Sequence, residues 1–234
     1  QAVADFERFV RSYTATINSV DDSVGRLYAA LERRGQLDNT IVVFTSDNGF
    51  LFGEHGMIDK RTMHEASIRV PLAVRYPAAI QGGTVIPQQV LSLDVAPSLV
   101  ELATGRDMAG VQGRSWVPLL KDGNTPWREA WLYEYNYETQ FPYTPNVRGI
   151  RRGNWKYVAY PHGDGGPLRH EEELYDIAND PGETRNLARD PDSAGKLAEL
   201  RAALAALLKD TGADPDPMPL DLGIRGELPE ESIR

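Results

Sequence analysis

One short stretch, residues 40–60 (TIVVFTSDNGFLFGEHGMIDK), gathers most of the side chains that could do chemistry. An apolar run ends at Asp47 and Asn48, two adjacent hard oxygen donors that suit Ca²⁺ or Mg²⁺ better than a soft metal. A D-N-G triplet is also common turn chemistry. Because open α/β sheets bind ligands beyond the carboxyl ends of their strands, the position directly after this run favours a metal site.

Lys60 ends the same stretch, 13 positions after Asp47. A lysine is most often a solvated surface charge, but beside a metal-bound anion it offers a positive charge and three donors to a departing oxygen. Arg61 and His64 follow closely and are candidates for the same pocket, although each is also an ordinary polar residue. Flanking glycines would let the backbone around His55 fold closely over a site, so His55 is a further candidate, with a plain surface connection as the alternative.

The composition argues against several classes of protein and of site. The 234 residues carry 25 Lys and Arg against 34 Asp and Glu, a formal net charge of −9. No basic cluster stands out, so a nucleic-acid partner is not expected and an anionic substrate must be held by local cations or a metal. No cysteine is present, which excludes disulfides and thiolate metal sites. No run reaches the roughly 18 apolar residues of a membrane span. The chain starts in helical periodicity without Met, which predicts that it is part of something longer.

The first half of the chain has the pattern of an α/β domain. Apolar residues at three- and four-residue steps predict a long helix from about residue 6 that ends near Gly35. The continuous apolar run 40–46 predicts a strand buried on both faces of an α/β sheet, ending near Thr45. Further along, the sequence predicts an edge strand over 65–77, a short helix within 91–105 and a loop over 113–127.

The pattern of the sequence changes at about residue 127. Short aromatic-rich segments separated by Gly, Pro and Asn predict a small antiparallel sheet, and leucines at helical spacing predict a closing helix over 193–209. The end of the chain is rich in Pro and acidic residues, typical of an extended tail. The expected sheet strands are 129–135, 147–153, 155–161 and 172–177, and the expected divisions of the chain are 1–126, 127–212 and 213–234.

Several of these segments, in this order, resemble the type I sulfatases of the alkaline-phosphatase-like superfamily. NTIVVFTSDNG, GEHG and DKRTMHEASIRVPLAVRYP resemble one conserved block of that family. The preceding helix, VLSLDVAPSLVELATG, VQGRSWVPLLKDG, VRGIRRGNWKYV and EELYDIANDPGETRNLARDP resemble neighbouring segments. The resemblance covers about residues 5–210 and implies the C-terminal portion of an α/β sandwich plus a small antiparallel subdomain with a closing helix.

The resemblance also implies roles for single residues. Asp47 and Asn48 correspond to two ligands of a Ca²⁺ site, with Mg²⁺ as an alternative ion, and Lys60 to the lysine that contacts the sulfate and steadies the leaving oxygen. His64 stands where many relatives carry tyrosine. The implied reaction is hydrolysis of a sulfate ester by a Ca²⁺-activated formylglycine, with the loop at 136–150 helping to choose a carbohydrate substrate.

The family's formylglycine motif and its other metal ligands have no counterpart in these 234 residues. The resemblance therefore implies the C-terminal half of a sulfatase, inactive alone, whose partners are a sulfated small molecule or glycan and the missing N-terminal half. Two alternatives stay open: a phosphonate or phosphodiester hydrolase of the same superfamily, and a non-catalytic remnant that acts as a structural partner. A periplasmic, secreted or lysosome-like compartment is suggested by the resemblance alone.

Overall fold

The computed structural model describes residues 2–136, 138, 146–161 and 171–214. Most of the expected substrate loop at 136–150 and of the expected tail at 213–234 lies outside these ranges. The chain forms two compact units, one built from Gln1–Asp47 and Pro71–Trp127, the other from Asn48–Val70 and Arg128 onward. The divisions expected near residues 126 and 212 stay a prediction about domains. None of the helices in the described ranges combines the length and apolar character that a bilayer crossing requires.

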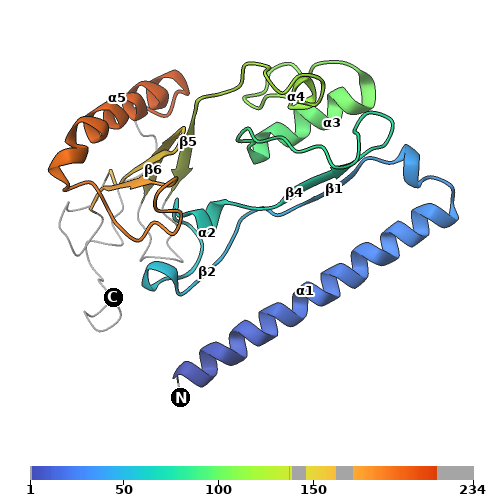
Figure 1. Cartoon of the computed structure of the whole chain (residues 1–234), viewed down its shortest axis with the longest axis horizontal. Helices are drawn as coiled ribbons and strands as arrows, with labels where there is room; N and C mark the ends of the chain where they lie inside the picture. The colour runs from blue at the N-terminus through green and yellow to red at the C-terminus, as the bar shows by residue number, and fades with distance from the viewer. Residues whose placement is uncertain (1, 137, 139–145, 162–170, 215–234) are drawn as a thin grey trace. The chain divides into compact units, whose positions relative to one another are not determined.

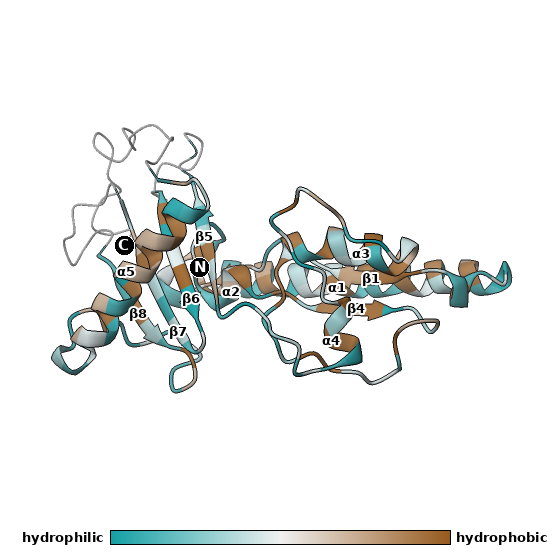
Figure 2. Ribbon diagram, turned by 90° about the horizontal axis from the view of Figure 1, so that it is seen from above, coloured by the Kyte–Doolittle hydropathy of each residue, from teal (hydrophilic) through white to brown (hydrophobic). Residues whose placement is uncertain are grey.

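The first unit begins with a long helix and contains two strands and two shorter helices (Figure 1). The helix within 91–105 is confirmed, and it ends at Gly105 with a left-handed backbone. Buried side chains of Trp116, Val117 and Leu119 form the core of this unit, and Figure 2 shows apolar residues along α3 and α4. The elements are α1 (Ala2–Arg33), β1 (Val42–Thr45), β4 (Leu72–Arg75), α3 (Val95–Thr104) and α4 (Val117–Lys121).

The predicted long helix is present as α1, which begins at Ala2, a few residues earlier than expected, and ends before Gly35, whose φ of +64 suits glycine. Its apolar stripe, however, is largely exposed within the part of the chain that the structure describes: no residue of α1 is buried, and Leu27 is 65% exposed. The stripe consists of Phe6, Phe9, Tyr13, Ile17, Val20 and Leu27.

The strand β1 ends at Thr45 as predicted, but the expectation that both its faces are buried is wrong for the described chain. It pairs antiparallel with β4 alone, and Phe44 is 45% exposed. An apolar run indicates only that a strand favours burial on both faces. A two-stranded sheet has few neighbouring elements that could bury it.

Two other expectations need correction. Within the edge strand expected over 65–77, only Leu72–Arg75 forms a strand, and Glu65–Ile68 forms the short helix α2. Within the loop expected over 113–127, Val117–Lys121 forms α4, with Pro118 in its first turn, where a missing N–H does no harm. Helices of four or five residues are too short to show a helical period in the sequence.

The second unit contains the predicted small sheet and closing helix. All neighbouring strands of the sheet are antiparallel, in the order β5-β6-β7-β8, and α5 packs on one face. A two-stranded hairpin and α2 belong to the same unit. Its elements are β2 (Leu51–Phe52), β3 (Ile58–Asp59), α2 (Glu65–Ile68), β5 (Ala130–Tyr135), β6 (Val147–Arg152), β7 (Trp155–Ala159), β8 (Glu173–Asp176) and α5 (Ala194–Asp210).

The side chains of β7 alternate between the two faces of this sheet, as the pleat requires. Trp155 and Tyr157 pack with leucines of α5, whereas Lys156 and Val158 contact the segment around Met63 on the opposite face. The sheet thus lies between α5 and the segment that follows the hairpin, and it positions the candidate site described next.

Candidate functional site

The hairpin β2–β3 brings two of the sequence-predicted site residues together. Asn48 precedes β2 and Lys60 follows β3, so the antiparallel pairing of the two strands returns the chain to its starting point. Lys60 Nζ donates a hydrogen bond to Asn48 Oδ1 at 2.9 Å. Asn48 Nδ2 donates to the Gly49 carbonyl at 2.8 Å, which directs the carboxamide oxygen towards the lysine.

Gly49 fixes this end of the hairpin against α2. Its N–H donates to the Ser67 carbonyl at 2.7 Å, and a Cβ at Gly49 would lie 2.1 Å from the Ala66 carbonyl oxygen. Only glycine allows the backbone to approach this closely. The D-N-G triplet is therefore more than a surface turn, because its third residue sets the position of the second.

The chain around Lys60 adopts unusual backbone conformations. His55, Asp59 and Arg61 all have positive φ, with values of 56, 95 and 86°, although L residues with side chains disfavour this region. Such conformations persist where the surrounding structure imposes them and gather at functional sites. The Arg61 side chain forms ion pairs with Asp59 and, at 3.5 Å, with Glu138.

The histidines His55 and His64 stack with ring centroids 3.9 Å apart. His64 is buried: its Nδ1 lies 3.0 Å from Thr62 Oγ1 and its Nε2 lies 3.3 Å from Glu173 Oε2. The Tyr160 hydroxyl donates to the other oxygen of Glu173 at 2.6 Å. His55 is the exposed ring of the stack, so it is better placed than His64 to meet a substrate, and His64 supports it from below.

The electrostatics of this cluster follow from burial and from paired charges. Burial lowers the pKa of His55, and the neighbouring His64 lowers it further. Burial alone would raise the pKa of Glu173, but His64 and the hydroxyls of Tyr160 and Tyr175 stabilise its anion, so the net pKa is lowered. Burial raises the pKa of Tyr133 to about 12.

A second cluster, which the sequence did not reveal, joins the segment after Lys60 to the sheet. Lys156 is fully buried, and its ammonium group contacts the Met63 carbonyl at 2.7 Å, Glu65 Oε1 at 2.7 Å and Glu183 Oε1 at 2.5 Å. Arg151 Nη1 lies 3.1 Å from Glu65 Oε1. In an alternating strand such as β7, a lysine reads as a solvent-facing residue, so no signal pointed to this role.

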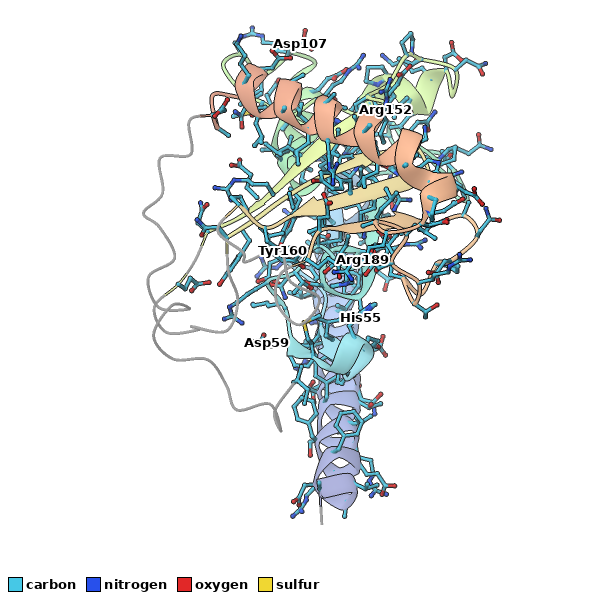
Figure 3. All side chains as sticks on the ribbon, turned by 90° about the vertical axis from the view of Figure 1, so that its left-hand side faces the viewer. His55, Asp59, Asp107, Arg152, Tyr160 and Arg189 are labelled. Atoms are coloured by element: carbon cyan, nitrogen blue, oxygen red, sulfur yellow. The ribbon has the colours of Figure 1, made fainter. Side chains whose placement is uncertain are left out.

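Figure 3 shows where these groups lie in the second unit. The labelled His55, Asp59 and Tyr160 lie on the side of the sheet away from α5, whereas Arg152 lies beside α5 and pairs with Glu199 at 3.3 Å. The candidate site is thus built on one face of the sheet.

The oxygens of Asp47 and Asn48 fit a hard divalent cation such as Ca²⁺ by their chemistry. The orientation of the Asn48 carboxamide supports this fit, because its oxygen faces a cationic group. Asp47 is exposed and ends the first of the two segments that build the first unit, and the Ser46 hydroxyl lies 3.4 Å from its Oδ1. Among the side chains that the structure describes, no three His, Cys, Asp or Glu residues are grouped so that they could hold a metal.

Comparison with known proteins assigns the chain to a family. Residues 53–210, more than half of the chain, match the family model described as N-sulphoglucosamine sulphohydrolase, C-terminal. The chain belongs to this sulfatase family. The N-acetylglucosamine-6-O-sulfatase of Bacteroides thetaiotaomicron is 38% identical to it over 218 residues, which are 90% of this chain and 38% of that relative.

Solved structures agree with the family assignment. A structure described as a complex with its substrate D-glucosamine-2-N,6-O-disulfate shares 37% identity and a TM-score of 0.76, over 87% of this chain and 41% of that one. The phosphonate monoester hydrolase of Agrobacterium radiobacter shares 29% identity and a TM-score of 0.69, over 83% and 40%. The sulfatase fold predicted from the sequence is therefore confirmed, and the chain spans about two fifths of the length of these relatives.

Proposed function

We propose that the full-length protein is a sulfuric ester hydrolase that cleaves a sulfate ester of a carbohydrate. The observation that carries the proposal is the hydrogen bond between Lys60 and Asn48 in a chain of the sulfatase family. It brings a cationic donor next to an oxygen that suits a divalent cation, and such groups can stabilise the negative charge of an ester during its cleavage. The sugar-sulfate relatives favour a sulfated glycan as substrate.

In this proposal Asp47 and Asn48 hold part of a Ca²⁺ site, for which Mg²⁺ is an alternative. The cation would neutralise the charge of the sulfate oxygens when bound. The remaining ligands and a formylglycine nucleophile would come from the part of the relatives' length that this chain does not span. The chain alone is therefore expected to be inactive.

Lys60 has the chemical role in this proposal. Its ammonium group donates to the ester oxygen that leaves as the alcohol, and offsets the negative charge that accumulates there as the S–O bond breaks. The strained backbone at Asp59 and Arg61 holds the lysine on the hairpin end. Arg61 and His55 lie near it in the chain and are proposed to contact substrate, with His64 holding His55 in place.

The test is the Lys60→Ala variant of the full-length protein. We expect kcat/KM for a sulfate ester to fall by roughly 10²–10³, the scale for losing one donor to a developing oxyanion. The loss should grow as the alcohol becomes a poorer leaving group, because more charge then accumulates on oxygen. Lys60→Arg should recover only part of the rate, since a planar guanidinium does not place a compact charge at the same point. Kinetics unchanged from wild type would remove Lys60 from the mechanism.

A second candidate is hydrolysis of a phosphonate monoester, favoured by the likeness to the Agrobacterium radiobacter enzyme. Measuring kcat/KM for matched aryl sulfate and aryl phosphonate esters decides between them. A preference for the phosphonate would overturn the sulfatase proposal, and turnover of neither ester would favour a non-catalytic partner role.

A further inference from the structure

We propose that Lys156 is a positioning residue for Lys60, and that it acts by fixing the segment from Thr62 to Glu65 against the sheet. This inference rests on the proposed function of Lys60. It assigns a role in that function to a residue 96 positions away in the sequence, on a strand whose other contacts are those of an ordinary core.

The contacts of Lys156 are concentrated on this segment. Its ammonium group donates to the main-chain carbonyl of Met63 at 2.7 Å and pairs with Glu65 at 2.7 Å. Glu183 completes this set of contacts among Lys156, Arg151, Glu65 and Glu183, here called the clamp. One oxygen of Glu183 accepts from Lys156 at 2.5 Å, and the other accepts from the Glu65 N–H at 2.7 Å. The segment is thus held by its backbone at two places and by a side chain at a third.

The charges of this clamp balance. Lys156 and Arg151 face Glu65 and Glu183, so two cations meet two anions in a buried place. A buried charge is tolerated only when it is paired and hydrogen-bonded. A well-packed apolar residue would hold the sheet together equally well, but it could not hold a main-chain carbonyl at a fixed point.

The clamp lies close enough to Lys60 to determine its position. Met63, whose carbonyl is held, is three residues from Lys60, and the residues that follow Arg61 are buried at Thr62, Met63 and His64. Gly149 leaves the space for Met63, because a Cβ there would lie 2.1 Å from the Met63 sulfur. The backbone that follows Lys60 is therefore held by this clamp, and the ammonium group of Lys60 is held by Asn48.

The test is a double-mutant cycle in the full-length protein between Lys156→Met and Lys60→Ala. Lys156→Met should lower kcat by roughly 10²-fold, the scale for a small misplacement of a catalytic group, and leave KM within about threefold. In the Lys60→Ala background the same substitution should lower kcat little, because the group that it positions is already gone. An equal loss in both backgrounds would overturn the proposal and make Lys156 a general structural residue.

Two further variants separate position from stability. Lys156→Met with Glu183→Gln removes the uncompensated carboxylate, so thermal stability should recover while kcat stays low. Recovery of both would overturn the proposal. Lys196→Met is the matched control, because Lys196 pairs with Glu199 on α5, on the other face of the sheet, and its kcat should match wild type.

Amide hydrogen exchange keeps this proposal separate from the proposed function. Lys156→Met should speed exchange at residues 60–65, and Lys196→Met should not. If the wild-type protein hydrolyses phosphonates instead of sulfates, the cycle is run with that ester. If it hydrolyses neither ester, the proposed function fails, and exchange at 60–65 alone then shows whether Lys156 fixes the segment. Unchanged exchange there would overturn the proposal whatever the substrate.

Discussion

At Gly49 the backbone passes so close to α2 that an added methyl group would overlap the Ala66 carbonyl oxygen. We expect Gly49→Ala to destabilise the second unit by about 1–3 kcal/mol, the usual cost of forcing extra atoms into packed structure. Urea unfolding monitored by tryptophan fluorescence would measure this. Gly25→Ala is the control: Gly25 lies within α1 with nothing within 4 Å of the added atom, so this variant should be stabilised by roughly 0.5–1 kcal/mol. Equal effects of the two substitutions would contradict the close approach.

The stacked histidines predict a pH dependence. The pKa of His55 is lowered in the folded state by burial and by His64, so the unfolded chain binds more protons at mildly acidic pH. Stability is then fully present above the unfolded pKa of about 6.5 and falls as the pH drops below it. The lowered pKa of Glu173 acts separately, because its contribution is lost only at more acidic pH, as the pH falls through its folded pKa.

Urea midpoints measured between about pH 7.5 and pH 5.5 check this prediction. The urea midpoint of the wild-type protein should fall towards acidic pH. In His55→Gln this fall should be smaller, because the titrating group is gone. A wild-type midpoint that rises towards acidic pH would reverse the sign and contradict the assigned cause.

The sequence identified candidate site residues only where residue type and order carry chemistry. Asn48 and Lys60 were predicted as neighbours in function, and the hairpin makes them neighbours in space. The support beneath them was not predictable, because the partners of Lys156 come from segments far apart in the chain. A lysine between aromatic residues also looks the same in a sequence whether it faces solvent or a buried carboxylate.

At the scale of elements, length decided what could be predicted. The helices α1 and α5 and the four strands of the sheet have enough residues to show a period, and all were expected. The helices α2 and α4 have four and five residues, which is little more than one turn. Their formation depends on what they pack against and not on a pattern in the sequence.

The exposed stripe of α1 predicts that the isolated chain self-associates. Apolar stripes bordered by polar residues mark surfaces that are normally covered, and in the proposed full-length enzyme the rest of the protein would cover this one. Ile17→Glu should shift the sedimentation profile towards monomer, because it places a charge within the stripe. Arg11→Glu is the control with a charge change off the stripe, and it should leave association unchanged. A wild-type chain that is monomeric at all concentrations would contradict this prediction.

At the scale of the whole molecule, metal binding should depend on the rest of the protein. Asp47 and Asn48 supply two oxygen-bearing side chains, whereas Ca²⁺ takes six to eight ligands. We therefore expect calorimetry to show weak Ca²⁺ binding to this chain and much tighter binding to the full-length protein, lost in Asp47→Ala with Asn48→Ala. Tight binding to the isolated chain would show that ligands from elsewhere are not required.

The hydrogen bond from the Glu65 N–H to Glu183 spans 118 residues of sequence. This separation determines how long after Glu65 its partner is synthesised. A ribosome that adds about 5–20 residues per second needs roughly 6–24 s to travel from one partner to the other. During that interval the segment that carries Lys60 has emerged, but the carboxylate that holds it has not been made. The nascent chain therefore presents this segment unclamped to chaperones and proteases, and a ribosome that stalls before Glu183 leaves a product whose hairpin is complete and whose anchor is missing.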